Sequence, residues 1–430
     1  MDFYSLNRIF ANWNGETNFK TIEDYYKNIK MNFLFVSGRV PILNHIVGGA
    51  GVRSSALIKA LAQIGNVDVI SFVKEPIESH IPNCNVVYSK YVPNENRLLL
   101  NSVRNRVWRN LKLFFQPRNP HTYFYTNKER EKIVVYYHNQ KHYDYVACHY
   151  IDDMVNCGLL RYLNKLIIDV DDNLVSITKF QLSNIDSAPL VIRLRNKWRT
   201  HSVGLMQRHI LKNARLSFYS NMNEPPFERS VFLHNVPQIK GGVSDVTDLT
   251  PMRILFTGLL NYFPNRYGII HFVERIFPLI KKKIPQLELN IVGLCNKEEV
   301  LLKLKSVNGV NVCGHVDNIQ DEYINCRVAV VPIYHGAGTS VKFIEGVMMN
   351  RPVVSTPIGA RGYSSVFKSD KHYMLAKTDQ EFADSVIELL TNREKANEMT
   401  REAYTIGESY FSERKFVEIV KDAINKLQQQ

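Results

Sequence analysis

Residues 330–356 read VVPIYHGAGTSVKFIEGVMMNRPVVST, and no other stretch of the chain is as informative about its fold. It predicts a buried strand, a glycine-rich loop, a helix and a second buried strand, in that order. This order is typical of a doubly wound α/β sheet, in which ligands bind beyond the carboxyl ends of the strands. The glycine-rich loop is therefore the first candidate for a binding site.

Short apolar runs alternate with helix-length segments on both sides of this stretch. In the C-terminal half they lie at 253–257, 287–292, 310–313, 328–331 and 352–355. In the N-terminal half they lie at 32–37, 67–72, 85–88, 145–148, 166–169 and 216–219. Such alternation predicts βαβ units. We therefore predict an α/β fold with two Rossmann-like, doubly wound parallel-sheet domains that face a cleft.

The domain boundaries follow from length and composition. A chain of 430 residues is longer than one core usually supports, and the proline-rich stretch 224–252 is typical of a linker. We assign 1–30 to an N-terminal extension, 31–238 to the first domain and 239–410 to the second. The last segment, 411–430, has apolar residues at helical spacing, so we expect a helix that crosses back toward the first domain.

The composition favours anionic partners. The formal net charge is +13, which suits nucleic acid, phosphorylated ligands or acidic lipid. No apolar run is long enough to span a bilayer, and the first residues lack a secretory pattern. Six cysteines without metal-ligand spacing are typical of a reducing compartment. We therefore expect a cytoplasmic protein.

The loop and the helix start that follows it suit a diphosphate. Gly336 and Gly338 allow a tight turn and a close approach of the backbone to a ligand. Thr339 and Ser340 are suited to an N-cap, where free amides and the helix dipole attract an anion.

Lys342 and Glu345 lie three residues apart, so they share one face of the predicted helix. A cation for phosphate and a carboxylate for sugar or ribose hydroxyls would then point the same way. An ordinary surface pair on a strand–loop–helix unit is the alternative interpretation.

These motifs resemble glycosyltransferase family 4 (glycosyl transferases group 1), a group of retaining GT-B enzymes. The resemblance covers about 31–425 and implies that Glu345 binds the nucleotide ribose. The family's first glutamate falls on Ala337, so backbone amides of residues 336–340 would hold the donor sugar. The family's usual arginine after Gly258 is Leu259 here.

The resemblance also assigns residues to roles. The implied catalytic residues are Lys342, Glu345 and His149. The implied donor-binding residues are Gly258, Arg266, His315, Val316, Gly336, Ala337, Gly338, Thr339, Ser340, Lys342 and Glu345. The implied acceptor-side and cleft residues are Gly49, Ala50, Gly51, Arg53, His149 and Asp171. The first domain is thus the expected acceptor side, and the second the nucleotide-sugar-binding side.

Three N-terminal features allow other interpretations. Residues 48–53, GGAGVR, resemble the family's loop that faces the donor phosphates. The alternative interpretation is a dinucleotide-binding site. This alternative is disfavoured because the spacing of the glycines does not match GxGxxG. His149 also fits a polar residue at a strand end. Asp169, Asp171 and Asp172 suggest a metal site, yet they lie outside the expected donor domain, so we expect no metal.

Two basic segments with aromatic residues lie in the first domain. Residues 98–115 form a basic amphipathic helix pattern, and 193–199 form a second basic run around Trp198. Both suit an anionic membrane surface, although solvated helix faces would look the same. No nucleic-acid motif accompanies them, so we expect no nucleic-acid partner.

The sequence therefore predicts a retaining glycosyltransferase without a cofactor, acting in cell-surface polysaccharide or glycoconjugate synthesis. It would move a sugar from a nucleotide-diphosphate donor, UDP- or GDP-linked, to a glycan or polyprenyl-linked acceptor. We expect it at the inner face of the plasma membrane as a peripheral protein. The alternatives are a sugar-nucleotide isomerase or hydrolase on the same fold, and a basic membrane- or nucleic-acid-binding protein with a degenerate donor site.

Overall fold

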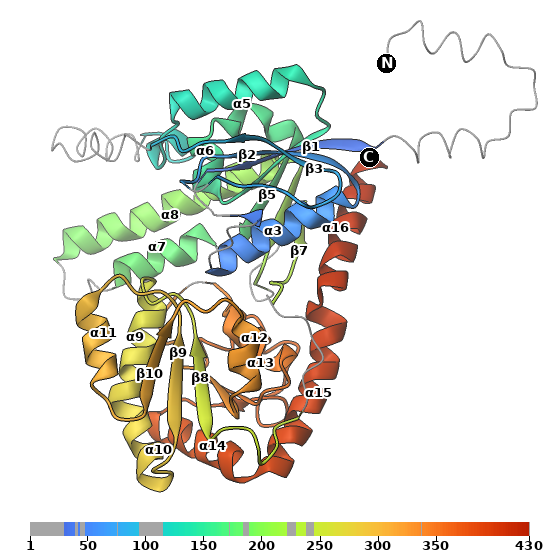
Figure 1. Ribbon diagram of the computed structural model, residues 1–430. Helices are drawn as coiled ribbons and strands as arrows, with labels where there is room; N and C mark the ends of the chain where they lie inside the picture. Colours follow the sequence, from blue (N-terminus) through green and yellow to red (C-terminus); the bar gives the residue numbers. More distant parts are fainter. Residues whose placement is uncertain are drawn as a thin grey trace, which may run out of the picture.

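The computed structural model describes residues 30–38, 42–43, 48–74, 76–93, 115–171, 173–183, 189–221, 229–237, 245–336 and 338–429. Within them, two parallel sheets with helices on their faces form two domains, one above the other in Figure 1. The predicted fold class is confirmed. The proposed extension 1–30, apart from Lys30, and the proposed boundary between 238 and 239 lie outside these residues.

The N-terminal sheet has seven strands in the order β3-β2-β1-β4-β5-β6-β7. The strands are β1 Met31–Ser37, β2 Gly65–Ser71, β3 Cys84–Ser89, β4 Tyr145–His149, β5 Leu166–Asp171, β6 Leu216–Tyr219 and β7 Ser230–Phe232. The helices are α3 Gly48–Ala62, η4 Pro120–Thr122, α5 Lys128–Gln140, α6 Ile151–Asn156, η5 Leu159–Lys165, α7 Leu174–Ser183 and α8 Leu190–Asn213. The strand β1 is almost entirely buried, because helices cover both faces of a parallel sheet.

The C-terminal sheet has six strands in the order β10-β9-β8-β11-β12-β13. The strands are β8 Arg253–Thr257, β9 Glu288–Val292, β10 Val310–Gly314, β11 Val328–Val331, β12 Val353–Ser355 and β13 Met374–Leu375. The helices are α9 Phe263–His271, η6 Phe272–Ile276, α10 Phe277–Lys283, α11 Glu298–Lys305, α12 Ile319–Ile324, α13 Val341–Met348, α14 Asp379–Thr391, α15 Arg393–Phe411 and α16 Glu413–Gln428.

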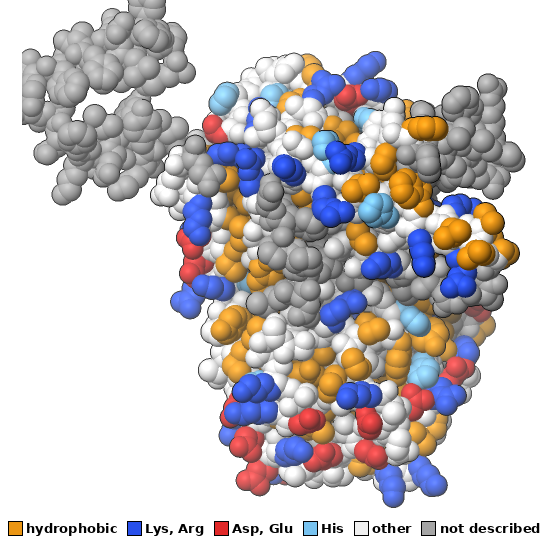
Figure 2. Space-filling model, turned by 180° about the vertical axis from the view of Figure 1, so that it is seen from behind, with side chains coloured by type: hydrophobic (Ala, Val, Ile, Leu, Met, Phe, Trp, Pro, Cys, Tyr) orange, Lys and Arg blue, Asp and Glu red, His pale blue; other side chains and the backbone are white. Residues whose placement is uncertain are grey.

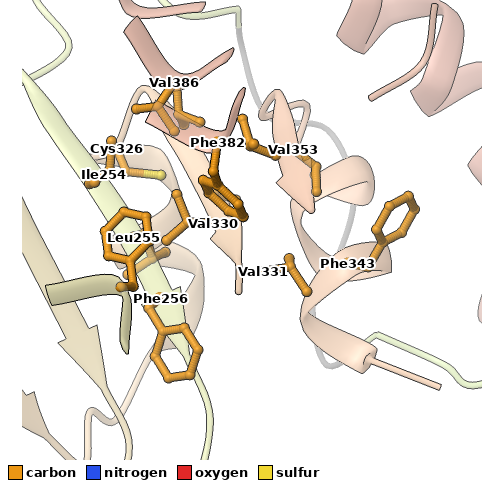
Figure 3. Packing of buried hydrophobic residues seen from close by; sticks show 14 of the residues in the cluster. Ile254, Leu255, Phe256, Cys326, Val330, Val331, Phe343, Val353, Phe382 and Val386 are labelled. Atoms are coloured by element: carbon orange, nitrogen blue, oxygen red, sulfur yellow. The ribbon is translucent and has the colours of Figure 1, made fainter. Parts of the chain in front are cut away.

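The core of the C-terminal domain lies on both sides of β11. Because side chains alternate along a strand, Val330 and Val331 point to opposite faces of the sheet (Figure 3). Val331 lies on the side of Phe343, which belongs to α13 (Figure 3). Since Phe343 is fully buried, this packing fixes the helix that carries Lys342 and Glu345 against the sheet.

The last two helices connect the domains. Helices α15 and α16 run along one edge of the molecule, from the C-terminal domain to the N-terminal domain (Figure 1). Phe416, Val420 and Ile424 of α16 are fully buried in the N-terminal core, where α16 packs against α3. The end of the chain is therefore part of the N-terminal domain's packing.

The first turn of α3 contains glycines that the sequence places in a loop. We expected residues 48–53 to precede the helix, but α3 already begins at Gly48. A Cβ atom at Gly49 would lie 3.2 Å from Cγ2 of Val341, the first residue of α13. The glycine therefore lets the starts of two helices from different domains lie close together. No helix among the described residues is long and apolar enough to cross a membrane.

Candidate functional site

A cavity of about 510 Å³ lies between the domains, beyond the carboxyl ends of strands from both sheets. The N-terminal domain contributes Gly49, Ala50, Val52, Tyr150 and Asp171 to its wall. Most other lining residues come from the C-terminal domain and follow β8, β9, β10 and β11. This is the position where doubly wound sheets bind ligands, so the cavity is the candidate active site.

Lys342 is the cation at the start of α13. Its Nζ donates to Oδ1 of Asn265 at 3.0 Å and lies 5.3 Å from the centre of the Phe256 ring. Loss of hydration lowers the pKa of Lys342 to about 8. The N-cap residue Ser340 makes no side-chain cap, and the amide of Phe343 donates to the Ser340 carbonyl, which leaves the amides of Val341 and Lys342 available to an anion.

Glu345 lies one turn further along α13 and is buried at the back of the cavity. Its Oε2 accepts from the hydroxyl of Tyr323 at 3.0 Å and lies 3.4 Å from that of Thr257. Burial raises the pKa of Glu345 and, together with the neighbouring carboxylate, that of Tyr323. The two hydroxyls hold the carboxylate in one orientation toward the cavity.

Glycines directly follow the adjacent strands β8 and β9 and line the cavity there. Gly258 follows β8 with a φ of 147°, and Gly293 follows β9 with a φ of 146°. A Cβ atom at Gly293 would lie 2.0 Å from the carbonyl oxygen of Gly258. A side chain there would push the two strand ends apart.

The glycine-rich loop is held from two sides. Arg361, which follows β12, donates from Nη2 to the carbonyl oxygens of Gly336 at 2.9 Å and Gly338 at 3.1 Å. Asn235, from the linker, donates to Oγ1 of Thr339 at 2.5 Å. Both Arg361 and Asn235 also line the cavity.

Arg53 does not line the cavity, contrary to prediction. Its guanidinium is buried and binds both carboxylate oxygens of Asp169, at 2.7 and 2.9 Å. It also donates to the carbonyl of Leu233 and to Oδ1 of Asn235, in the linker. Arg53 therefore links the N-terminal sheet to the linker, and Asp169, a candidate metal ligand, is engaged in this ion pair.

His149 is also buried, behind the cavity wall. Its Nδ1 lies 2.6 Å from Oγ of Ser54, and its ring stacks on Tyr150 at 3.8 Å. Tyr150 and Asp171, not His149, form the surface there. Tyr150 has a φ of 67° and Asp171 a φ of 50°, so the backbone is strained where it meets the cavity.

The structure thus brings together most of the predicted site. The predicted residues that line the cavity are Gly49, Ala50, Asp171, Gly258, His315, Val316, Gly336, Gly338, Thr339, Ser340, Lys342 and Glu345. Those described that do not line it are Gly51, Arg53, His149 and Arg266. Arg266 instead donates to the carbonyls of Leu260 and Asn261. Ala337, Asp172 and nearly all of 98–115 lie outside the described residues.

Sequence reasoning missed the residues that hold this site from a distance. Tyr323 comes from α12 and Arg361 from the loop after β12, and neither belongs to a motif. The sequence does indicate that Gly293 could belong to the site, because this glycine directly follows a buried strand, as Gly258 does.

Two doubly wound domains with a cavity between the carboxyl ends of their sheets define the GT-B class of fold. Residues 251–392 match the family described as Glycosyl transferases group 1. The C-terminal domain thus resembles glycosyltransferase group 1 domains, and the predicted resemblance to GT-B glycosyltransferases is confirmed. Membership of family 4 in particular stays a prediction.

Two solved structures share the fold along most of the chain, and one relative matches in sequence. Sucrose-phosphate synthase from Thermosynechococcus elongatus superposes with a TM-score of 0.64 at 16% identity, covering 93% of this chain and 100% of that one. Anabaena Alr3699/HepE in complex with UDP and glucose gives a TM-score of 0.60 at 13% identity, with the same coverage. A Klebsiella pneumoniae protein, "Uncharacterized 44.6 kDa protein in cps region", is 24% identical over 66% of this chain and 74% of its own length.

Proposed function

We propose that the chain transfers a sugar, with retention, from a UDP- or GDP-linked donor to a glycan or polyprenyl-linked acceptor. The donor would lie against the C-terminal domain, and the acceptor would enter from the side of Tyr150 and Asp171. The observation that carries this proposal is the position of Lys342 at the uncapped start of α13, inside the interdomain cavity. The UDP bound by the Anabaena protein supports a nucleotide donor on this fold.

The chemistry of transfer fits this position. As the bond between the anomeric carbon and the diphosphate oxygen breaks, negative charge grows on the leaving diphosphate. Amides at a helix start and a lysine ammonium stabilise such charge in a site shielded from water. We therefore propose transfer without a metal, with Lys342 and the first turn of α13 facing the diphosphate and Glu345 facing hydroxyl groups of the donor.

The proposed acceptor lies at an anionic membrane surface, in cell-surface polysaccharide or glycoconjugate synthesis. Residues 31–238 hold 26 Lys and Arg against 15 Asp and Glu, whereas residues 239–430 hold 24 against 22. Figure 2 shows basic side chains spread over the N-terminal domain and a mixture of both signs below it. The Klebsiella relative from a cps region supports the proposed pathway. The protein would be cytoplasmic and peripheral on the inner face of the plasma membrane.

The first half of α8 supports this location. At ~100° per residue, Leu190, Val191, Leu194 and Trp198 fall on one stripe, and all are exposed. Basic residues flank the stripe on both sides, and α8 contains no Asp or Glu. Such a helix face suits the headgroup region of an anionic bilayer.

The experiment is a transfer assay with UDP- and GDP-sugars, with and without a membrane extract as acceptor. The proposal predicts that release of nucleoside diphosphate depends on acceptor and continues in EDTA. Turnover of donor at the same rate without acceptor would favour the hydrolase or isomerase alternative. Binding to membranes without any donor turnover would favour the basic binding protein with a degenerate site.

A further inference from the structure

The cavity has few positive charges for a ligand that carries a diphosphate. Among the described lining residues, the Lys and Arg side chains are Lys342 and Arg361. Leu259, at the position where the related pattern has arginine, also lines the cavity and brings no charge. Arg266, the other predicted phosphate cation, faces backbone carbonyls outside the cavity.

Arg361 lines the same cavity and lies beside the glycine-rich loop. Its Nη2 holds the carbonyls of Gly336 and Gly338, so its guanidinium is fixed against the glycine-rich loop. Its Nε–H is buried and has no acceptor within the part of the chain that the structure describes. Because Nε is closed to solvent, an anion in the cavity would act on the charge that is delocalised over the guanidinium plane. A guanidinium is always charged and matches the geometry of phosphate oxygens.

We propose that Arg361 is a second cation for the donor diphosphate and supplies, from the loop after β12, the charge that Leu259 lacks. This inference rests on the proposed function. Arg361 would also couple binding to loop shape, because the carbonyls it holds belong to the loop that faces the donor sugar. The carbonyl of Gly338 points toward Arg361. Because the peptide bond between Gly338 and Thr339 is trans, the N–H of Thr339 points the opposite way.

The test is calorimetric titration of UDP and GDP, and of uridine and guanosine, into wild-type protein and Arg361→Gln. We expect affinity for the preferred diphosphate to fall about ten- to a hundredfold, as for loss of a charged hydrogen bond, while nucleoside affinity is kept. Arg266→Gln is the matched control and should bind as wild type does. Adding Leu259→Arg to Arg361→Gln should restore part of the lost diphosphate affinity.

Three results would overturn the inference. Equal diphosphate affinity of wild type and Arg361→Gln would remove Arg361 from the site. Equal losses for diphosphate and nucleoside, with no recovery by Leu259→Arg, would leave Arg361 only a structural role in the loop. If the wild type does not bind the diphosphate, the proposed function fails as well. If the wild type binds it and Arg361→Gln binds it equally well, only the inference about Arg361 fails. If Arg361→Gln does not fold, Arg361→Lys, which keeps the charge but not the planar fork, should retain most of the diphosphate preference.

Discussion

At the scale of single residues, Lys342 gives the site a dependence on pH. Burial lowers its pKa to about 8, so the free protein loses this charge as the pH rises above that value. The protonated form is the one that attracts a diphosphate. Donor affinity should therefore be constant below about pH 7 and fall by at most about tenfold per unit above about pH 8.

Titration of a sugar nucleotide at several pH values checks this. Lys342→Arg is the matched variant, because an arginine keeps its charge over the whole range and should give a flat profile. A wild-type affinity that does not change with pH, or the same decline in Lys342→Arg, would contradict the assignment.

The buried position of Arg53 leads to a prediction about the stability of the protein rather than about ligand binding. It is buried with Asp169, so Arg53→Met would leave a buried carboxylate without its cation. Breaking one side of a buried pair costs about 3–5 kcal/mol of unfolding free energy. The double variant Arg53→Met with Asp169→Asn should recover much of this loss, because the uncompensated charge is gone. Urea unfolding measures both; equal stability of the single and double variants would contradict this account.

At the scale of elements, α16 should behave as part of the N-terminal domain. Phe416 is fully buried in that core and contacts the ring of His234 at 5.6 Å. Phe416→Ala should cost about 3–5 kcal/mol and lower the melting temperature of the N-terminal domain in calorimetry. The control Glu418→Ala removes an exposed side chain from the same helix. An unchanged melting profile for Phe416→Ala would show that α16 does not support this domain.

The strands show how far the sequence predicts elements. The apolar runs predicted at 32–37 and 253–257 form β1 and β8, because burial on both faces of a parallel sheet demands such runs. β7 and β13 were missed: Ser230–Phe232 has three residues and Met374–Leu375 two, too few for a periodic pattern. The start of α3 was predicted too late, because glycine is a poor helix former and its presence does not indicate a helix. At Gly49 the close contact with Val341 explains why a glycine lies in the first turn.

The site shows a similar limit. The loop and helix at 336–345 form a local motif, so their place at the cavity could be read from the sequence. Glu345 depends on Tyr323, and the loop depends on Arg361, through contacts between residues far apart in the chain. Arg53 was misplaced for the same reason, since its partner Asp169 lies 116 residues away. The sequence shows which residues can carry the chemistry, but the partners of these residues that lie far away in the chain can be identified only from the folded structure.

At the scale of the whole molecule, the first half of α8 should bring the N-terminal domain to an anionic membrane. In Figure 1 this half projects past the sheet, and its Arg193, Arg195 and Lys197 are exposed. Each basic residue near such a surface adds about 1 kcal/mol. Changing these three to Gln should weaken binding to phosphatidylglycerol vesicles by roughly a hundredfold.

Cosedimentation with vesicles measures this binding, with phosphatidylcholine vesicles as the neutral reference. The control variant changes Arg208 and Lys212, which lie in the second half of the same helix, to Gln. It should lose far less binding than the triple variant. Equal binding by the triple variant and the wild type would refute membrane docking through α8, as would an equal loss in the control.

The central claim is that a nucleotide-diphosphate sugar binds in the interdomain cavity against α13. Calorimetric titration of UDP- and GDP-sugars into wild-type protein and Lys342→Met tests it most directly. We predict that the wild type binds one of these donors and that Lys342→Met binds the same donor about tenfold or more weakly, with an unchanged melting temperature. Donor affinity that is equal in both proteins, or no binding of any donor by the wild type, would contradict the claim.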